Sequence, residues 1–445
     1  MFNKPPNWRE ILTGELLNQI LDHPEKQALD KILSKANEEY VYWDKFKYLP
    51  IPKDIKPEEA WAYFKFRYRI NGEETPVSSM MGDTFSYNMT KSLYKELSFI
   101  DMHSAGFISS LSQKPTSAET DKLIISGLTE EAIASSQIEG ASTTRKVAKE
   151  MLMSGRKAHN KDEQMIINTY KVMAQLDDLK EVDLSLKILL DIQTIITKDT
   201  LENEDYAGRL RTDSDEIVVL DNLTGKVVHY PPAETEMKKE LDRLIEFANT
   251  KDAEYDFFHP VLKAIVLHFW LAYLHPFPDG NGRTARAIFY WYLRKNNYWM
   301  FKYLSVSRAI KESRKGYDDA YLYSENDDND LTYFIVYNMK AITKSIESLL
   351  THYDKKRKEV EINRKIANRF ENLNERQIAL LNYFTKNPEK DTDIKTHKNL
   401  HGISYETARQ DLLRLSNAGI LAETKKVHRK VFIPNLNEIK KIVNA

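Results

Sequence analysis

Hydrophobic residues recur at helical spacing through most of the chain. Between residues 186 and 196, the isoleucines at 188, 192, 195 and 196 share one helix face, with Leu189 beside them. Residues 259–274 form an apolar segment whose second residue, Pro260, suits a first helical turn. This pattern predicts a mainly α-helical protein with a small β component.

The β component is predicted from two short runs of β-branched residues. Residues 216–220 and 226–230 flank a five-residue turn that contains Gly225, and two prolines follow the second run. Such runs around a short glycine-containing turn are typical of a β-hairpin, which we expect over residues 216–230.

Four regions follow from changes in composition along the chain. Residues 1–95 are rich in aromatic side chains, for which we favour buried packing over the alternative of a ligand surface. Residues 96–350 have the pattern of a helical domain. Residues 351–372 form a strongly charged helical connector, and residues 373–445 have the character of a separate small domain.

The overall composition excludes several classes of protein. The net charge of −1 over 445 residues favours neither nucleic acid nor a membrane as partner of the whole molecule. The sequence has no cysteine, which excludes disulfides, thiol catalysis and thiolate metal sites. No apolar run has the length of a membrane span or of a signal peptide, so we expect a cytoplasmic protein with no membrane partner.

The richest chemistry lies in the twelve residues His275-Pro276-Phe277-Pro278-Asp279-Gly280-Asn281-Gly282-Arg283-Thr284-Ala285-Arg286. They lie between apolar residues 259–274 and a helix-like segment, residues 284–293, so they form a loop that leads into a helix N-terminus. Free backbone N–H groups and the helix dipole favour an anion there. Glycines let the backbone approach a phosphate closely, and a carboxylate is a hard oxygen ligand for Mg²⁺.

This loop resembles, position by position, the signature of the Fic (filamentation induced by cAMP) family, His-x-Phe-x-Asp/Glu-Gly-Asn-Gly-Arg-x-x-Arg. The resemblance implies transfer of a nucleoside monophosphate to a protein hydroxyl. His275 would be the base, Asp279 the Mg²⁺ ligand, and Phe277 an anchor in the core. The nucleotide would be bound by the backbone of Gly280 to Gly282, by Asn281 through a phosphate hydrogen bond, and by Arg283 and Arg286 at the β- and γ-phosphates.

A second motif, Ser135-x-x-x-Glu139-Gly140, resembles the inhibitory motif of the same family. We expect a helix over about residues 129–140, with Thr129 as its N-cap and Gly140 at its end. A carboxylate such as Glu139 opposes the dipole in a last helical turn unless a cation pairs with it. The resemblance implies that Glu139 pairs with Arg286 in the place of the γ-phosphate, steadied by Ser135. The alternative is an ordinary solvated glutamate.

The hairpin gains a role from the resemblance. In this family a "flap" hairpin lies over the signature loop, and the segment Gly208 to Arg211 resembles the entry to that flap. An exposed strand edge there can bind an extended target segment by strand addition. Val218, Val219 and Leu220 are the docking residues that we expect.

The C-terminal region resembles a winged helix-turn-helix domain. Helices are expected over residues 374–384 and 405–417, before two short strands that flank a basic turn. Between residues 372 and 445, thirteen Lys and Arg face eight Asp and Glu. DNA contacts are expected from Arg409, Gln410, Arg414, Lys425 and Lys426. The alternative is a protein-interaction or dimerisation module, because Glu406 and Asp411 on the same helix would repel phosphates.

Together these features predict a self-inhibited, Mg²⁺-dependent adenylyltransferase that moves AMP from ATP to a Ser, Thr or Tyr hydroxyl. The acceptor is another protein or the chain itself, and DNA and a second copy of the chain are further expected partners. Two alternatives stay open. One is a DNA-binding regulator whose Fic domain senses nucleotide or a partner, and the other is a Fic enzyme that uses another nucleotide.

Overall fold

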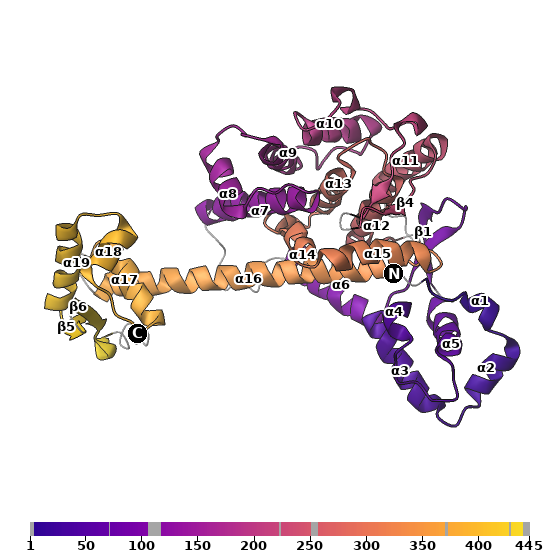
Figure 1. The fold of residues 1–445 in the computed structure, drawn as a ribbon, viewed down its shortest axis with the longest axis horizontal. Helices are drawn as coiled ribbons and strands as arrows, with labels where there is room; N and C mark the ends of the chain where they lie inside the picture. The colour runs from indigo at the N-terminus through magenta and orange to yellow at the C-terminus, as the bar shows by residue number, and fades with distance from the viewer. Residues whose placement is uncertain are drawn as a thin grey trace. The chain divides into compact units, whose positions relative to one another are not determined.

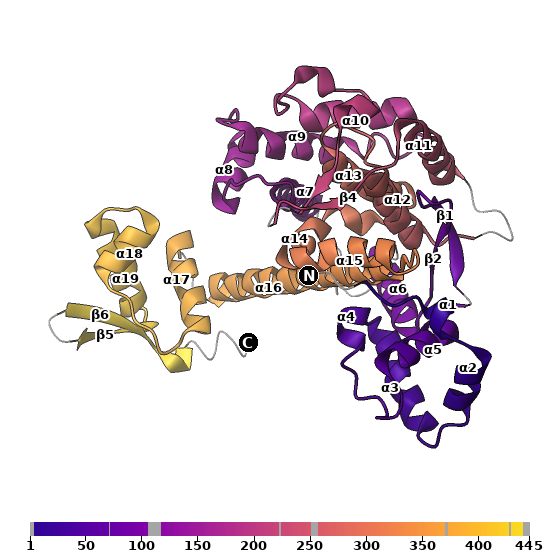
Figure 2. The same ribbon diagram turned by 45° about the vertical axis from the view of Figure 1, so that its right-hand side comes forward.

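The computed structural model describes residues 4–70, 72–105, 117–221, 224–250, 257–369, 373–426 and 429–438. It is predominantly helical (Figures 1 and 2), and the β structure of the described residues consists of three two-stranded antiparallel sheets. The predicted fold class, mainly α with a small β component, is confirmed. None of the described helices is both long and apolar enough to cross a membrane.

The chain divides into two compact units, residues 1–347 and 348–445, which are described separately. The division falls inside α16 (Thr332–Arg369), a helix that continues through the charged segment beginning at residue 351.

The first part of unit 1 is a small helical layer built on aromatic residues. Its elements are α1 (Trp8–Ile11), α2 (Gly14–Leu21), α3 (Lys26–Glu39), α4 (Trp43–Phe46), α5 (Pro57–Arg69), β1 (Glu73–Ser78), β2 (Thr84–Tyr87) and α6 (Lys91–Ser104). Trp43, Phe46, Trp61 and Phe64 pack together in its core, with Tyr333 of α16 among them. Most of the aromatic residues of this region therefore serve buried packing, whereas Tyr48 and Tyr94 are exposed.

A buried ionic cluster fixes α5 to the turn between α15 (Arg314–Asn326) and α16. Lys65 Nζ lies 2.6 Å from a carboxylate oxygen of Asp327 and 3.0 Å from one of Asp330, and Arg69 Nη1 lies 2.9 Å from Asp330. Burial alone would raise the pKa of Asp330, but Arg69 and Lys65 lower it to about 2. Asp330 thus stays charged, whereas burial raises the pKa of Asp327, and the cluster connects two segments that are far apart in sequence.

The rest of unit 1 surrounds a central pair of helices, α12 (Pro260–Leu274) and α13 (Asn281–Lys295). In each of them 13 of 15 residues are buried, so this pair forms the core of the region and supports the loop that joins its two helices. The surrounding elements are α7 (Ser117–Ile138), α8 (Arg145–Ser154), α9 (Lys161–Gln175), α10 (Leu186–Thr197), η1 (Glu204–Tyr206), η2 (Asp213–Asp215), β3 (Val219–Leu220), β4 (Val227–His229), α11 (Glu234–Asn249), η3 (Trp299–Lys302) and α14 (Val306–Glu312).

Among the described residues, unit 2 contains the end of α16 followed by further helices and two strands. These are α17 (Glu375–Lys386), α18 (Ile394–His401), α19 (Tyr405–Asn417), β5 (Leu421–Lys426) and β6 (Arg429–Pro434). Thr392 adds one bridge to the outer side of β6 at Phe432. This is the order of elements expected for a winged helix-turn-helix, an assignment that stays a prediction.

The orientation of α19 corrects one expectation. Its face with Ala408, Leu412 and Leu415 lies in the core. Asp411, expected to repel phosphates at the surface, is also buried, and its carboxylate accepts hydrogen bonds from Arg376 and Asn374. The charge of Asp411 is therefore neutralised inside unit 2.

Candidate active site

The signature loop begins at the last turn of α12. His275 is the C-cap of α12 and adopts a left-handed conformation (φ 49°), and Gly280 is the N-cap of α13 with φ 84°. A Cβ at Gly280 would lie 2.9 Å from a methyl carbon of Thr197, so this position has no room for a side chain. Helix α13 begins at Asn281, three residues earlier than predicted, so its first free N–H groups belong to the loop itself.

His275 is prepared to act as a base. Burial is the main cause that lowers the pKa of His275 to about 4, and the carbonyl of Ala272 offsets only part of this effect. From the sequence alone, the near-neutral pKa of an ordinary imidazole is expected for His275, and burial of the ring corrects this expectation. Nδ1 lies 3.2 Å from the Ala272 carbonyl oxygen, which can only accept, so Nδ1 carries the proton and Nε2 is the free base.

Asn281 holds the loop in shape. Its side chain accepts a hydrogen bond from the N–H of Phe277 (2.9 Å) and donates one to the carbonyl of Phe277 (2.8 Å). Phe277 itself is fully buried, as expected for an anchor. The side chain of Asn281 is thus bound to the loop backbone, and the phosphate contact expected for it stays a prediction.

Two further residues that the sequence did not single out position the loop. Arg211 donates from Nε to the carbonyl of His275 (2.8 Å), and its own N–H donates to the carbonyl of Pro276 (2.9 Å). Gln193 donates to the carbonyl of Asp279 (3.1 Å). Gln193 lies on the mainly apolar buried stripe of α10, and a large polar residue in that stripe was a signal available in the sequence.

The two arginines of the signature face different surroundings. Arg283 Nη1 donates to the carbonyl of Ile196 (2.9 Å), and its Nη2 lies 3.5 Å from Asp279 Oδ1. Its Nε is buried and has no hydrogen-bond partner among the described residues. A buried N–H donor without an acceptor costs free energy of folding. A phosphate oxygen that accepts a hydrogen bond from this Nε would remove that cost.

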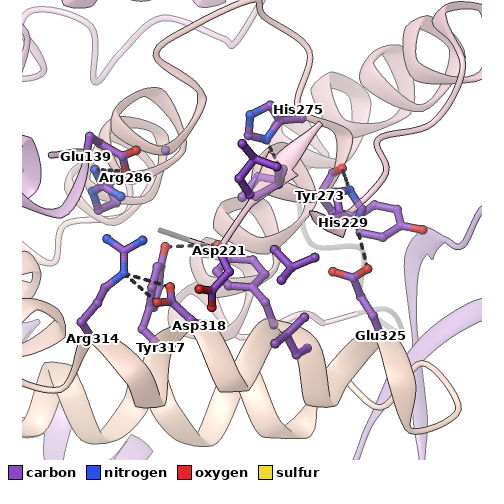
Figure 3. A pocket seen from close by; sticks show the side chains of 17 residues that line it. Glu139, Asp221, His229, Tyr273, His275, Arg286, Arg314, Tyr317, Asp318 and Glu325 are labelled. Atoms are coloured by element: carbon purple, nitrogen blue, oxygen red, sulfur yellow. Dashed lines mark hydrogen bonds and ion pairs between the residues drawn. The ribbon is translucent and has the colours of Figure 1, made fainter. Parts of the chain in front are cut away.

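Arg286 is held by α7. Its Nε donates to Ser135 Oγ (2.8 Å), and its Nη2 donates to the Ser135 carbonyl (2.9 Å) and to Glu139 Oε1 (2.9 Å; Figure 3). Ser135 therefore steadies Arg286 rather than Glu139. Burial would raise the pKa of Glu139, but Arg286, Arg314 and Arg283 outweigh it and keep that pKa below its usual value, so the pair is ionic.

Helix α7 is longer than predicted. It runs from Ser117 to Ile138, so Thr129 lies buried in its interior and is not its N-cap. Its end is as expected: Gly140 has φ 101°, and the N–H of Ala141 donates to the carbonyl of Ser136, a Schellman arrangement.

Three polar contacts join α7 to α13 along their length. Glu139 and Ser135 contact Arg286, and Glu131, one turn farther back, accepts a hydrogen bond from Tyr290 Oη (2.7 Å), one turn farther along α13. The spacing of four residues on both helices makes this an antiparallel polar seam. The inhibitory motif is thus part of an extended helix contact.

Glu139 also lies directly against the start of α13. A Cβ built on Gly282 would lie 2.2 Å from Glu139 Oε1. The carboxylate therefore occupies the space that the missing side chain of Gly282 leaves open. This is the position where the N-terminal end of the helix favours an anion.

The predicted hairpin is confirmed and is shorter than expected. Strands β3 and β4 pair in antiparallel fashion, with residues 222 and 223 of the turn outside the described residues, and Val218 precedes the strand. His229 of β4 contacts both Glu325 (2.8 Å) and the carbonyl of Tyr273 (2.8 Å), which fixes the hairpin beside the end of α12.

A cavity of about 170 Å³ lies under this hairpin (Figure 3). Val219 and Leu220 form its flap side, and His275, Gly282, Arg286 and Glu139 form the side of the signature loop. The remaining wall comes from one face of α15, with Arg314, Tyr317, Asp318, Tyr321, Leu322 and Glu325. The cavity thus combines aromatic and apolar surface with the base and the ion pair.

The donor set around Asp279 fits Mg²⁺ that arrives with a nucleotide. The described residues contain no group of three or more His, Cys, Asp and Glu that could hold a metal by themselves. The Asp279 side chain is 45 % exposed. Its contacts with Gly280 and Arg283 are both made by Oδ1. Mg²⁺ is commonly bound by one or two carboxylates together with substrate phosphates and water, so a single accessible carboxylate beside an anion site is adequate.

Comparisons with known proteins agree with this site. Residues 183–293, which include the whole signature loop, match the model of the Fic/DOC family, so the chain carries a domain of that family. Ser135 and Glu139 lie outside the matched residues.

Relatives with curated names share a short segment. A protein adenylyltransferase Fic from Nematostella vectensis is 39% identical over 82 residues, 18% of this chain and 17% of that protein. One from Aedes aegypti is 38% identical over 60 residues, 14% of this chain and 12% of that protein. The chain therefore spans less than a fifth of the length of these relatives.

Among solved structures, a Fic family protein from Desulfovibrio desulfuricans G20 is 16% identical, with a TM-score of 0.49 over 78% of this chain and 97% of that one. A Fic domain containing signaling protein from Bacteroides thetaiotaomicron is 20% identical, with a TM-score of 0.43 over 58% of this chain and 95% of that one.

Proposed function

We propose that the protein is a self-inhibited adenylyltransferase, which transfers AMP from ATP to a Ser, Thr or Tyr hydroxyl of a protein. The observation that carries this proposal is the unprotonated Nε2 of His275 beside the N-terminus of α13 and Arg286, an anion site that the Glu139 carboxylate fills. A base next to an anion site is what nucleotidyl transfer to a hydroxyl requires. The curated relatives, named protein adenylyltransferases, favour AMP as the transferred group.

The proposed reaction is a displacement at the α-phosphorus. His275 Nε2 takes the proton of the incoming hydroxyl as its oxygen bonds to the α-phosphorus, and the bond from the α-phosphorus to the bridging oxygen of pyrophosphate breaks. The N–H groups of Asn281 and Gly282 stabilise charge on the α-phosphate oxygens, while the N–H of Gly280 donates to Asp279 Oδ1. Arg283 and Arg286 neutralise the departing pyrophosphate. Asp279 would hold Mg²⁺, which supplies further charge neutralisation on the triphosphate.

The cavity offers a place for the nucleoside. The rings of Tyr317 and Tyr321 and the side chains of Leu220 and Leu322 form apolar and aromatic walls beside Arg286. A base and ribose need such surface, with the phosphates directed to the arginines. Nucleotides other than ATP would compete for the same walls.

Self-inhibition follows from the ion pair. Arg286 is 3% exposed, and the Glu139 carboxylate accepts a hydrogen bond from its Nη2. A γ-phosphate that binds this guanidinium has to replace the carboxylate. The state competent for ATP is therefore a minor population while Glu139 is in place, which weakens apparent affinity.

The flap is the proposed docking site for the target. Val218 and Leu220 are 37% and 50% exposed, and Val219 and Leu220 also line the cavity. An extended segment added beside β3 would bring a hydroxyl toward His275.

One experiment tests the proposal directly. The Glu139→Gly variant, incubated with Mg²⁺ and an equimolar mixture of ATP, GTP, CTP and UTP in a cell extract, should yield AMP adducts on proteins by mass spectrometry. The matched control is Glu139→Gly combined with His275→Ala, which should give none. Adducts of another nucleotide would show that the transferred group is not AMP. Identical adducts from both variants would show that His275 is not the base and would contradict the proposed mechanism.

A second candidate function, DNA binding by unit 2, is favoured by the burial of Asp411. The outward face of α19 then presents Arg409, Gln410 and Arg414, all exposed, with Glu406 engaged by Arg409 at 3.0 Å. Lys425 is also exposed, whereas the side chain of Lys426 lies outside the described residues. Binding of a random-sequence duplex by the whole chain should weaken when Arg409 and Arg414 are both changed to Ala. An unchanged affinity would favour a protein-interaction module.

A further inference from the structure

The end of the inhibitory helix has a second arginine contact besides Arg286. Arg314, the first residue of α15, donates from Nη1 to the carbonyl of Ile138, the last residue of α7. Its Nε donates to both carboxylate oxygens of Asp318, each at 2.9 Å, which orients the guanidinium. Figure 3 shows Glu139, Arg286 and Arg314 gathered at one side of the pocket.

Both charged residues are badly placed for their own helices. A carboxylate at the C-terminal end of α7 and a cation at the N-terminal end of α15 each oppose the local helix dipole. The contact between the two helices removes both problems. Arg314 brings a positive charge to the C-terminal carbonyls of α7, and its field, after that of Arg286, lowers the pKa of Glu139.

A neighbouring contact holds the same turn. Lys311 of α14 donates to the side-chain oxygen of Gln137, one residue before Ile138. The last turn of α7 is therefore fixed from the side of α14 and α15, through Gln137 and Ile138. Loss of this hold would let Glu139 leave Arg286 without any change in either residue.

We propose that Arg314 is a positioning residue for inhibition: it caps the last turn of α7 and so holds Glu139 on Arg286. This inference rests on the proposed self-inhibition by Glu139. Arg314 would act in the inhibited state, in which Glu139 pairs with Arg286 and Arg314 contacts the end of α7. Removal of its charge should therefore increase, rather than decrease, affinity for ATP.

The alternative role of Arg314 is direct contact with the nucleotide, because it also lines the cavity. The two roles predict opposite effects of Arg314 on the affinity for ATP. A capping arginine weakens ATP binding only through Glu139, so its effect disappears when Glu139 is absent. An arginine that binds phosphate or ribose strengthens ATP binding, with or without Glu139.

The test is a double-mutant cycle on the full chain, with binding of ATP in MgCl₂ measured by isothermal titration calorimetry. Its variants are Glu139→Gly, Arg314→Gln, and the two combined. Arg314→Gln removes the charge and keeps a helix-compatible stem. The matched control is Lys315→Ala, since Lys315 is the next residue, pairs with Asp319 in the same i, i+4 fashion and is 84% exposed. Arg314→Lys, which keeps the charge, is the rescue variant.

Arg314→Gln should bind ATP roughly 5- to 10-fold more tightly than wild type, at the lower end of ordinary coupling between sites. Lys315→Ala and Arg314→Lys should bind as wild type does, and Arg314→Gln should add nothing to Glu139→Gly. Weaker or unchanged binding by Arg314→Gln, or an equal effect in both backgrounds, would overturn the role of Arg314. If Glu139→Gly itself fails to tighten ATP binding, the self-inhibition fails as well, which is a separate result of the same cycle.

Discussion

Glu139 Oε1 lies 2.9 Å from Arg286 Nη2, and the same oxygen fills the space left open by Gly282. One carboxylate therefore forms an ion pair with the Arg286 guanidinium and also fills the anion-binding end of α13. These are the two groups that a triphosphate would need. This geometry thus favours regulation by direct competition between the Glu139 carboxylate and the triphosphate for the same site, rather than by a conformational change transmitted from a distant site.

Replacement of Glu139 by Gly should raise AMP transfer at subsaturating ATP by roughly 5- to 150-fold, the range of a coupling of about 1–3 kcal/mol. The reason is that Arg286 no longer has an internal partner. Initial rates with radiolabelled ATP measure the effect. The gain should vanish in Glu139→Gly with Arg286→Ala, and equal rates for wild type and Glu139→Gly would contradict self-inhibition.

His275→Ala, made in the Glu139→Gly background, should reduce transfer by about 10²–10⁴-fold, the usual contribution of a general base. The fold should be unaffected, which circular dichroism can check. If transfer stays within about twofold, another group takes the proton.

The pH dependence of transfer should report the low pKa of His275. A base acts in its neutral form, and a pKa lowered to about 4 leaves the imidazole neutral throughout the range above about pH 5. The rate limited by this group should thus stay level from pH 8 down to about pH 5.5 and fall only below that. An exposed histidine would already lose half the rate near pH 6.5. A midpoint near pH 6.5 in the Glu139→Gly variant would mean that His275 is not buried during the reaction.

Asp279→Ala should remove most transfer together with its steep response to Mg²⁺, because the carboxylate proposed to hold the metal is gone. The measurement is a MgCl₂ titration of the initial rate at fixed ATP in the Glu139→Gly background. Arg283 contacts this carboxylate at 3.5 Å, so Asp279→Asn, with a neutral oxygen in place, is the matched control. An unchanged midpoint for Mg²⁺ in Asp279→Ala would place the metal elsewhere.

Asn281→Ala should act on stability rather than on phosphate binding. It leaves the N–H and carbonyl of Phe277 without their partner, which costs about 1–3 kcal/mol for a buried group. Thermal melting should therefore shift to lower temperature, and transfer should fall with it. A variant with unchanged melting and a selectively weakened affinity for ATP would restore the phosphate contact expected from the sequence.

The sequence was informative where the site is continuous. His275 to Arg286 are twelve consecutive positions, so a loop between two helices constrains their geometry locally, and the glycines mark where the backbone is left-handed or crowded. Glu139 was also within reach, because its charge is misplaced for its own helix.

What could not be predicted depends on long-range packing. Arg211 and Arg314 support the site from other segments, and their partners are mostly backbone carbonyls, which no side-chain pattern encodes. The pKa of His275 and the burial of Asp411 likewise depend on surrounding elements rather than on neighbours in sequence.

The space shared by Glu139 and Gly282 has a practical consequence for ligand discovery. A compound that binds at the start of α13 must first displace the Glu139 carboxylate. The increase in melting temperature that it causes is therefore smaller, because the Glu139–Arg286 ion pair is lost on binding. Thermal-shift screens of the wild-type chain would consequently rank good nucleotide mimics as weak. The Glu139→Gly chain, in which this internal competitor is missing, is the form in which such compounds would show their intrinsic affinity.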